Sequence, residues 1–246
     1  MTGQIAAVIL AGGQARRLGG ADKTLLDLGG QPILTRIIAA LGLANIAISA
    51  NGDPVRFAAF GRPVLSDGIF VNQGPLAGVL AGLDWAAAIG ASELLTVPGD
   101  TPFIPRGLEQ TLSPAPARAR SGGRSHHLVA LWPIACRGAL RRLLDSTGLS
   151  LTAQTADSVP HRHGPAGARG TSIARVAGIA AGRTLSVAAF AASLGMKDVD
   201  FAAGTWDLFF NVNSLDDLAK ARDIIKTAAP PMSAAAGAGA PGTGPP

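Results

Sequence analysis

The residues best suited to chemistry lie in a glycine-rich, basic segment near the beginning of the chain, "VILAGGQARRLGGADKT" at positions 8–24. Gly12 and Gly13 lack side chains, so backbone N–H groups there can approach an anion closely. Arg17 and Lys23 add positive charge, and guanidinium and ammonium groups both suit the oxygens of a triphosphate. The segment therefore predicts a polyphosphate-binding loop; the alternative is a glycine-rich surface turn with solvated arginines.

Two familiar phosphate-binding loops do not match this segment. Its glycines come in two pairs, at 12–13 and 19–20, which do not supply the dinucleotide fingerprint G-x-G-x-x-G. The Walker A loop requires a glycine directly before its lysine, whereas Asp22 precedes Lys23 here. The segment thus indicates phosphate binding without identifying the nucleotide.

Polar residues also follow three apolar runs that predict strands. Asn51 ends "IAISAN", Asp67 ends "PVLSD", and Asp100 follows "ELLTV" and a Pro-Gly break. In a parallel α/β sheet the ligand lies beyond the carboxyl ends of the strands, so we expect these residues to share one site with the glycine-rich loop. Each has a structural alternative: an Asx turn for Asn51, a loop cap for Asp67 and a helix N-cap for Asp100.

Strand and helix patterns alternate through the first hundred residues. Compact apolar runs predict strands, and apolar residues at helical spacing predict helices that begin near Pro32 and Pro75. The predicted strands are 5–10, 45–49, 63–67 and 93–97, and the predicted helices are 31–42 and 74–90. This alternation predicts a Rossmann-like α/β fold, with a mostly parallel, twisted sheet and helices on both faces.

The second half of the chain gives weaker patterns. Its predicted strands are 126–133 and 207–213, and its predicted helices are 136–146, 184–195 and 214–228. In the last helix Ser214 is the predicted N-cap, and Leu215 is expected on the buried face with Leu218. Residues 146–182 show no convincing period. The segment 228–246 consists mainly of Ala, Gly and Pro without charge, so we expect a disordered tail.

Composition favours a single domain at 1–227 and argues against several other classes of protein. With 48% hydrophobic residues the chain can bury a sizeable core, and its one cysteine, Cys136, excludes a disulfide framework or a cysteine-rich zinc site. The apolar run 5–11 is too short for a secretory signal or a membrane span. Residues 106–183 hold eleven arginines and three acidic residues, which favours an anionic partner. An aromatic content of 4% weakens the case for base stacking on nucleic acid.

The segment "LAGGQARRLGGADKTLLDLGGQPIL" closely resembles the signature of nucleotidyltransferases, specifically the molybdenum cofactor guanylyltransferases. The resemblance continues in "GPLAGVLAGL" at 74–83, "VPGDTPFIP" at 97–105 and "FFNVNSLDDLAKA" at 209–221. The related cytidylyltransferases show Leu-Ala-Ala-Gly in the first block, so Gly12-Gly13 points to guanine. The resemblance implies a fold like that of the nucleotide-diphospho-sugar transferases. It also implies transfer of GMP from GTP to molybdenum-molybdopterin, with release of pyrophosphate.

The resemblance also implies roles for individual residues. The nucleotide-binding residues that it implies are Leu10, Ala11, Gly12, Gly13, Lys23, Asn51, Asp67 and Asp100. It implies that Lys23, Asp100 and Arg17 are catalytic and that Asp100 holds Mg²⁺, since a carboxylate beside phosphate suits that ion. Asn211 and Asn213, at alternate positions of the last predicted strand, are implied in the pterin cleft, with a structural polar network as the alternative.

By the same resemblance, the N-terminal half binds the nucleotide and the C-terminal half binds the pterin. His126 matches a histidine of the family and is either a pterin or phosphate contact or a structural residue. Arg118, Arg120 and Arg124 are candidates to receive the pterin phosphate. Gly99 stands where a cysteine is common in the family, and we expect no consequence from that difference.

The resemblance implies GTP and molybdopterin as substrates, Mg²⁺ as the cofactor and molybdoenzyme maturation proteins as further partners. We expect a cytoplasmic monomer with neither nucleic acid nor membrane as partner. The alternative among enzymes is a nucleotidyltransferase that uses CTP with the same pterin, or another sugar or cofactor phosphate. The rival outside enzymes is a nucleotide-sensing or nucleic-acid-binding module that uses the basic middle segment, against which Lys23 and Asp100 argue.

Overall fold

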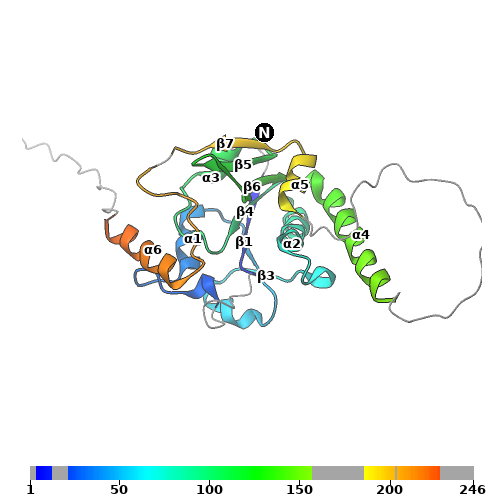
Figure 1. Ribbon diagram of the computed structural model, residues 1–246, viewed down its shortest axis with the longest axis horizontal. Helices are drawn as coiled ribbons and strands as arrows, with labels where there is room; N and C mark the ends of the chain where they lie inside the picture. The colour runs from blue at the N-terminus through cyan, green and yellow to red at the C-terminus, as the bar shows by residue number, and fades with distance from the viewer. Residues whose placement is uncertain (1–3, 13–21, 157–185, 203, 228–246) are drawn as a thin grey trace, which may run out of the picture.

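The computed structural model describes residues 4–12, 22–156, 186–202 and 204–227, apart from the side chains of 147–156 (Figure 1). These residues form a seven-stranded sheet. The strands, in the order in which they lie across the sheet, are β3 (Val64–Leu65), β2 (Ile46–Ser49), β1 (Ile5–Leu10), β4 (Glu93–Pro98), β6 (Arg124–Pro133), β5 (Ala117–Ser121) and β7 (Lys197–Asp200). The strands β3, β2, β1 and β4 are parallel, β6 is antiparallel to β4 and β5, and β7 is parallel to β5. The predicted Rossmann-like, mostly parallel sheet is confirmed.

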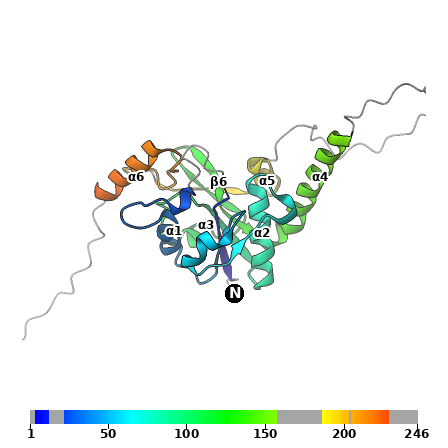
Figure 2. The ribbon, with the colours of Figure 1, turned by 90° about the horizontal axis from the view of Figure 1, so that it is seen from below.

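Helices cover both faces of this sheet. The helices are α1 (Ile33–Leu41), α2 (Pro75–Ala88), α3 (Leu108–Leu112), α4 (Arg137–Ala156), α5 (Val187–Ser193) and α6 (Leu215–Thr227). On one face lie α1, α3 and α6, and on the other lie α2, α4 and α5; the separation of α1 and α6 from α2, α4 and α5 is also visible in Figure 2. Because side chains alternate along a strand, Ala7 and Ile9 of β1 join the core under α1 while Ala6 and Val8 join the core under α2.

Helix α2 lies unusually close to the sheet, and this closeness sets one wall of the site. Pro75 begins the helix at a position that needs no backbone N–H donor. A Cβ atom at Gly78 would lie 2.6 Å from Oγ of Ser49, and one at Gly82 would lie 2.8 Å from Cγ1 of Val8. The two glycines therefore allow the helix backbone to pack directly against β1 and β2.

The predicted strand at 207–213 is wrong, because local hydrogen bonds hold this segment as a loop. The side chain of Asp207 accepts a hydrogen bond from the backbone N–H of Phe209 at 2.9 Å, an Asx turn that competes with strand pairing. The backbone N–H of Val212 donates to the carbonyl oxygen of Asp100 at 2.8 Å. This loop therefore lies beside the end of β4, where Asp100 is.

Two further expectations in the second half need correction. Helix α4 extends to Ala156, well beyond the predicted end at residue 146. Leu215 is 68% exposed, because the buried face of α6 begins one turn later with Leu218 and continues with Ala221. The predicted N-cap is confirmed, since Oγ of Ser214 accepts a hydrogen bond from the N–H of Asp217 at 3.1 Å.

The apolar patterns in β5, β7 and α3 are too weak for these elements to be predicted. In β5 the inward positions are the small residues Ala117, Ala119 and Ser121, while Arg118 and Arg120 face outward. Those two arginines form ion pairs with the aspartates of β7, which is half acidic and has no buried position. Pairing between strands, rather than apolar periodicity, therefore defines this edge of the sheet.

Parts of the earlier expectations fall outside the described residues. These are the predicted tail at 228–246 and most of the segment 146–182, of which α4 accounts for the first residues. The boundary of the single domain at 227 stays a prediction. Within the described ranges, no helix is long and apolar enough to cross a membrane.

Candidate active site

A cavity of about 430 Å³ opens at the carboxyl ends of the parallel strands. The predicted site residues that line it are Leu10, Ala11, Gly12, Lys23, Asn51, Asp67, Asp100 and Asn211. The structure thus brings together side chains from the ends of β1, β2, β3 and β4, as expected from the rule for parallel sheets. Gly13 and Arg17 lie outside the described residues, and Asn213 contacts Lys23 without lining the cavity.

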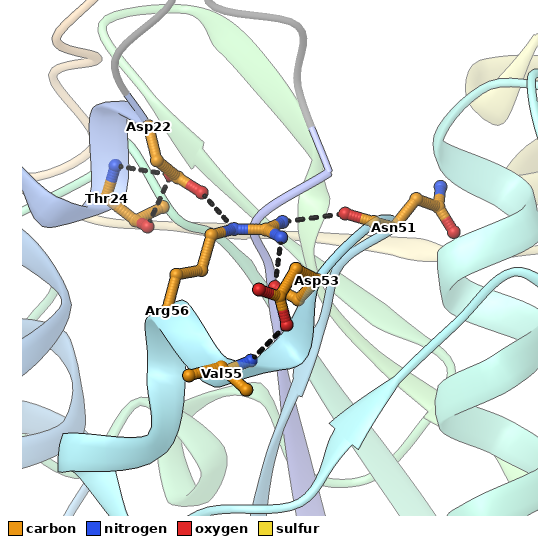
Figure 3. Close-up of polar contacts among 6 residues, drawn as sticks. All are labelled: Asp22, Thr24, Asn51, Asp53, Val55 and Arg56. Carbon is orange, nitrogen blue, oxygen red and sulfur yellow. Dashed lines mark hydrogen bonds and ion pairs between the residues drawn. The ribbon is translucent and has the colours of Figure 1, made fainter.

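Lys23 begins a short 3-10 helix, η2 (Lys23–Leu25), that Asp22 caps. Oδ1 of Asp22 accepts hydrogen bonds from the backbone N–H of Thr24 at 3.1 Å and from its hydroxyl at 2.7 Å (Figure 3). The ammonium group of Lys23 donates to Oδ1 of Asn213 at 2.8 Å. The lysine therefore reaches across the site from the N-terminal segment to the loop that precedes α6.

Asp100 presents a buried carboxylate oxygen to the site. Its Oδ1 atom is buried and has no hydrogen-bond partner among the described residues. Burial raises the pKa of Asp100 above its ordinary value, and the nearby ammonium group of Lys23 opposes this increase. A carboxylate held in this way, with a cation beside it and an oxygen without a partner, is suited to bind a metal ion.

The chemistry of the site fits Mg²⁺ better than a transition metal. No group of three or more His, Cys, Asp or Glu side chains that could hold a metal occurs in the described part of the chain. Mg²⁺ is commonly held by one or two carboxylates together with phosphate oxygens and water. The unpartnered oxygen of Asp100 is therefore compatible with Mg²⁺ that arrives with a nucleotide.

Asn51 and Asp67 form a hydrogen-bonded pair at the other end of the cavity. Nδ2 of Asn51 donates to Oδ2 of Asp67 at 2.6 Å, and Oδ1 of Asn51 accepts from the backbone N–H of Asp67 at 3.0 Å. Oδ1 of Asn51 also accepts from the hydroxyl of Ser66 at 3.3 Å. Burial raises the pKa of Asp67, and the hydrogen bond from Asn51 opposes this shift. Asn51 thus acts on the site through Asp67, and its predicted contact with the nucleotide stays a prediction.

The loop at 207–213 brings its two asparagines to the site although it is not a strand. Oδ1 of Asn211 accepts from the buried hydroxyl of Thr101 at 3.2 Å, and Asn211 also lines the cavity. Asn213 accepts from Lys23, as described above. Both residues are therefore held by residues of the N-terminal half, and this loop closes the cavity on the side of Asp100.

Sequence reasoning missed Arg56, which lies in the 3-10 helix η3 (Pro54–Phe60). Its guanidinium group donates hydrogen bonds to Asp22 and to the carbonyl oxygens of Asn51 and Asp53 (Figure 3). No pattern in the sequence marks this arginine, because its partner Asp22 lies 34 positions away. Sequence reasoning also missed Asn72, in the turn before α2, which lines the cavity.

Gly99, at the position where a cysteine is common in the family, packs against the segment that carries Lys23. A Cβ atom at Gly99 would lie 2.4 Å from Cγ2 of Thr24 and 3.1 Å from the carbonyl oxygen of Leu10. Thr24 is 3% exposed and its hydroxyl is bonded to Asp22, so it has little freedom to move. The absence of a side chain at Gly99 therefore allows η2 to pack close to the end of β4.

We expect the Gly99→Ala variant to lower the free energy of unfolding by about 1–3 kcal/mol, as overpacking of buried sites typically does. The variant should also weaken activity, because Thr24 must shift and Lys23 is its neighbour. Urea unfolding gives the stability change. Gly138→Ala is the matched control, since the nearest atom to its added Cβ is the end of Arg142, 3.5 Å away. Equal effects of the two substitutions would contradict the packing argument.

A second cavity, of about 290 Å³, adjoins the first, and both are lined by Pro98, Leu128 and Asn211. Only the second half of β6 pairs with β4, so its first residues extend past the end of β4 and form a wall of this cavity. Arg124 and His126 lie in that wall. The two cavities therefore meet beside the end of β4.

His126 belongs to a polar network as well as to the cavity wall. Its Nε2 atom lies 2.8 Å from Oγ of Ser121, which donates to Oδ1 of Asp207 at 2.8 Å. Its ring lies 4.8 Å from that of Phe209, between centroids. Burial lowers the pKa of His126, and the carboxylate of Asp207 opposes this decrease. His126 therefore has a structural role, and its contact with the pterin stays a prediction.

Of the three arginines considered for the pterin phosphate, Arg124 alone lines the second cavity. Arg118 forms an ion pair with Asp198 and lies 2.9 Å from Nδ1 of His127 through its Nη1 atom. Arg120 lies 3.6 Å from Asp200. Because carboxylates of β7 already neutralise Arg118 and Arg120, Arg124 is the better candidate.

Comparison with known proteins gives consistent results. A family model described as the MobA-like NTP transferase domain matches residues 7–159. The molybdenum cofactor guanylyltransferase of Acidiphilium cryptum is 47% identical over 214 residues, which cover 86% of this chain and 91% of that protein. The molybdenum cofactor guanylyltransferase of Rhodobacter capsulatus is 39% identical over 230 residues, which cover 92% of this chain and 100% of that protein.

Solved structures share the fold at low sequence identity. Molybdopterin-guanine dinucleotide biosynthesis protein A from Archaeoglobus fulgidus has a TM-score of 0.59 and 16% identity, with 91% of this chain and 99% of that chain covered. CMP:2-keto-3-deoxy-manno-octonic acid synthetase complexed with CTP has a TM-score of 0.55 and 15% identity, with 91% and 98% covered. Both likenesses concern the arrangement of the sheet and its helices.

Proposed function

Because the chain belongs to the family of MobA-like NTP transferases, we propose that it transfers GMP from GTP to molybdenum-molybdopterin. The products are molybdopterin guanine dinucleotide cofactor and pyrophosphate. Relatives named molybdenum cofactor guanylyltransferase that match most of the chain support this activity. The structural observation that carries it is the meeting of Lys23 and the unpartnered carboxylate oxygen of Asp100 at one cavity.

GTP would lie in the larger cavity, between two groups of residues with different chemistry. The triphosphate lies toward Lys23 and Asp100, where a cation and a metal-binding carboxylate are close together. The guanosine lies toward Asp67, whose carboxylate accepts hydrogen bonds from N–H groups of guanine or from ribose hydroxyls. Leu10, Ala11 and Gly12 follow β1 between these two ends.

The reaction is a displacement at the α-phosphorus of GTP. An oxygen of the terminal phosphate of the pterin forms a bond to this phosphorus, the bond to the bridging oxygen of the β-phosphate breaks, and pyrophosphate leaves. The attacking phosphate is already anionic at neutral pH, so the step depends on alignment and charge neutralisation rather than on a strong base. Lys23 donates to the phosphate oxygens and stabilises the charge that develops on them.

Mg²⁺ is the cofactor that we propose, with Asp100 as its protein ligand. When bound, it neutralises charge on the phosphate oxygens of the nucleotide. Asp100 supplies the carboxylate oxygen, and the ammonium group of Lys23 opposes the rise in its pKa that burial causes. The hydroxyl of Thr101 donates a hydrogen bond to Asn211, which lines the same end of the cavity.

The acceptor pterin would occupy the second cavity, where Arg124 is placed to bind its phosphate. This position lies beside the end of β4, which Asp100 follows, and the proposed displacement has the pterin oxygen approach the α-phosphorus opposite the leaving pyrophosphate. We place the reaction in the cytoplasm, where both substrates would be available. The alternative is that CTP, rather than GTP, is the nucleotide substrate used with the same pterin. A binding experiment that compares the two nucleotides distinguishes these possibilities.

Thermal unfolding in the presence of nucleotides tests the proposed function. At a GTP concentration of about one hundred times Kd with Mg²⁺ present, binding should stabilise the protein by about 2.7 kcal/mol. For a domain of this size that corresponds to an increase in Tm of roughly 5–10 °C. CTP, ATP and UTP at the same concentration should raise Tm less, and Asp67→Ala should reduce the difference. A larger increase with CTP would overturn the choice of guanine.

A further inference from the structure

Arg56 connects the two ends of the nucleotide cavity (Figure 3). Its Nε atom donates to Oδ2 of Asp22 at 3.1 Å, and its Nη2 atom donates to the carbonyl oxygen of Asn51 at 2.7 Å. We propose that Arg56 is a positioning residue for nucleotidyl transfer, which holds the phosphate-binding lysine at a fixed place relative to the base-binding end. The inference rests on the proposed function, since it concerns how one nucleotide contacts both ends.

At the phosphate end, Arg56 acts through Asp22. The two carboxylate oxygens of Asp22 have different partners: Oδ1 caps η2 through Thr24, and Oδ2 binds Arg56. The cap fixes the start of the short helix in which Lys23 is the first residue. Loss of Arg56 would leave Oδ2 of Asp22 without this partner and the carboxylate held by Thr24 alone, so the direction of the Lys23 side chain would be less well defined.

At the base end, Arg56 acts on the backbone that follows β2. Nη2 donates a hydrogen bond to the carbonyl oxygen of Asn51, and Nη1 donates one to the carbonyl oxygen of Asp53. The side chain of Asn51 in turn holds the carboxylate of Asp67. The arginine therefore belongs to one continuous set of hydrogen bonds that runs from Asp67 to the segment carrying Lys23.

Only an arginine can make this set of contacts. The three bonds use three different nitrogens of one planar group, whereas a lysine offers a single nitrogen. The guanidinium carbon also lies 4.5 Å from the ring centroid of the buried Phe57. The side chains of Arg56 and Asp22 are 30% and 17% exposed. The Arg56–Asp22 pair is therefore partly shielded from water.

The test compares the affinities for GTP and GMP, because GMP lacks the phosphates that Lys23 would contact. In wild-type protein we expect GTP with Mg²⁺ to bind more tightly than GMP, and Lys23→Met to remove most of that preference. Arg56→Met should reduce the preference about tenfold, which corresponds to about 1.4 kcal/mol. Asp22→Asn should act in the same direction. Arg62→Met is the matched control: this partly buried arginine donates to the carbonyl oxygen of Ala44 and lines neither cavity.

A double-mutant cycle separates positioning from a general loss of structure. In the Lys23→Met background, Arg56→Met should change the preference for GTP over GMP by less than about twofold, because residues that act through one contact are not additive. Arg56→Lys, which keeps a positive charge but loses the fork, should fall between wild type and Arg56→Met. It also supplies the comparison if Arg56→Met does not remain folded at the assay temperature.

Each outcome bears on the inference. An unchanged preference for GTP over GMP in both Arg56 variants would overturn it, as would equal effects of Arg56→Met with and without Lys23. Wild-type protein that binds no GTP would overturn the proposed function itself, and the inference with it. A preference that is lost with Lys23→Met but kept with Arg56→Met leaves the proposed function intact and rejects the role of Arg56 alone.

Discussion

Replacement of Asp100 by asparagine is expected to reduce Mg²⁺-dependent turnover by about a thousandfold, since metal-assisted charge neutralisation supplies several kcal/mol to such reactions. Asparagine keeps the shape of the side chain but removes the charged oxygen that would hold the metal. The variant should still fold and should retain measurable affinity for GTP. The rate of pyrophosphate release at saturating GTP and pterin, measured over a range of Mg²⁺ concentrations, gives the effect.

The same substitution should make the metal-free protein more stable at neutral pH. Burial raises the pKa of Asp100 in the folded state, so the folded protein disfavours its ionised form. The contribution of Asp100 to the free energy of unfolding is therefore fully present below the pKa of the unfolded state. It is lost as pH rises through the raised pKa of the folded state. The Asp100→Asn variant has no carboxylate at this position, so it does not lose stability in this way as pH rises. Its advantage in Tm over wild type should be greatest near neutral pH and should decrease in acid.

Asp223→Asn is the matched control for both measurements, because that carboxylate is 72% exposed on α6 and pairs only with the exposed Lys226 among the interactions that the structure describes. It should leave turnover unchanged and show no comparable gain in stability. Full Mg²⁺-dependent turnover in Asp100→Asn would exclude the metal-binding role. A variant that loses both turnover and stability would indicate a folding defect instead.

Replacement of Lys23 by methionine is expected to lower kcat by about a hundredfold to a thousandfold, the range seen when one preorganised donor to a developing charge is removed. Methionine keeps the length of the aliphatic stem, so packing around η2 should persist. The ammonium group also opposes the increase in the pKa of Asp100. Without it that pKa rises further, so the acid limb of the pH profile of kcat/KM should move to higher pH.

Lys226→Met is the control for this second variant, since that lysine is 75% exposed at the end of α6. It should change neither kcat nor the pH profile. A drop in kcat without any movement of the acid limb would mean that Lys23 acts on phosphate but has no influence on Asp100. An unchanged kcat would remove Lys23 from the catalytic groups.

The elements near the site could be predicted from the sequence because their patterns are strong and local. The apolar run of β1 and the helical spacing in α2 are both buried as expected. The loop at 207–213 misled the prediction because its apolar residues, Phe209 and Val212, are buried without strand pairing. The edge strand β7 and its neighbour β5 were missed because ion pairs between them, which no single-strand pattern reveals, accompany their pairing.

For the site, the sequence located the polar residues but not their partners. Asp100 and Lys23 could be singled out from their place after strands and glycines, and the structure brings both to one cavity. The use of the Asn51 amide within the protein could not be predicted, since it depends on how β2 and β3 lie side by side. Arg56 could not be predicted as a site residue either, because its contact with Asp22 also depends on the fold.

The hydrogen bond between Lys23 and Asn213 spans 190 positions of the chain. During translation, the lysine therefore emerges from the ribosome long before the asparagine that accepts its hydrogen bond. The sheet around β1, β2 and β4 can assemble earlier, but the ammonium group finds its partner only when the loop before α6 has been made. Closure of so long a loop is slow, and it belongs to the last stage of folding. Newly made chains should thus acquire native structure before they acquire a complete nucleotide site.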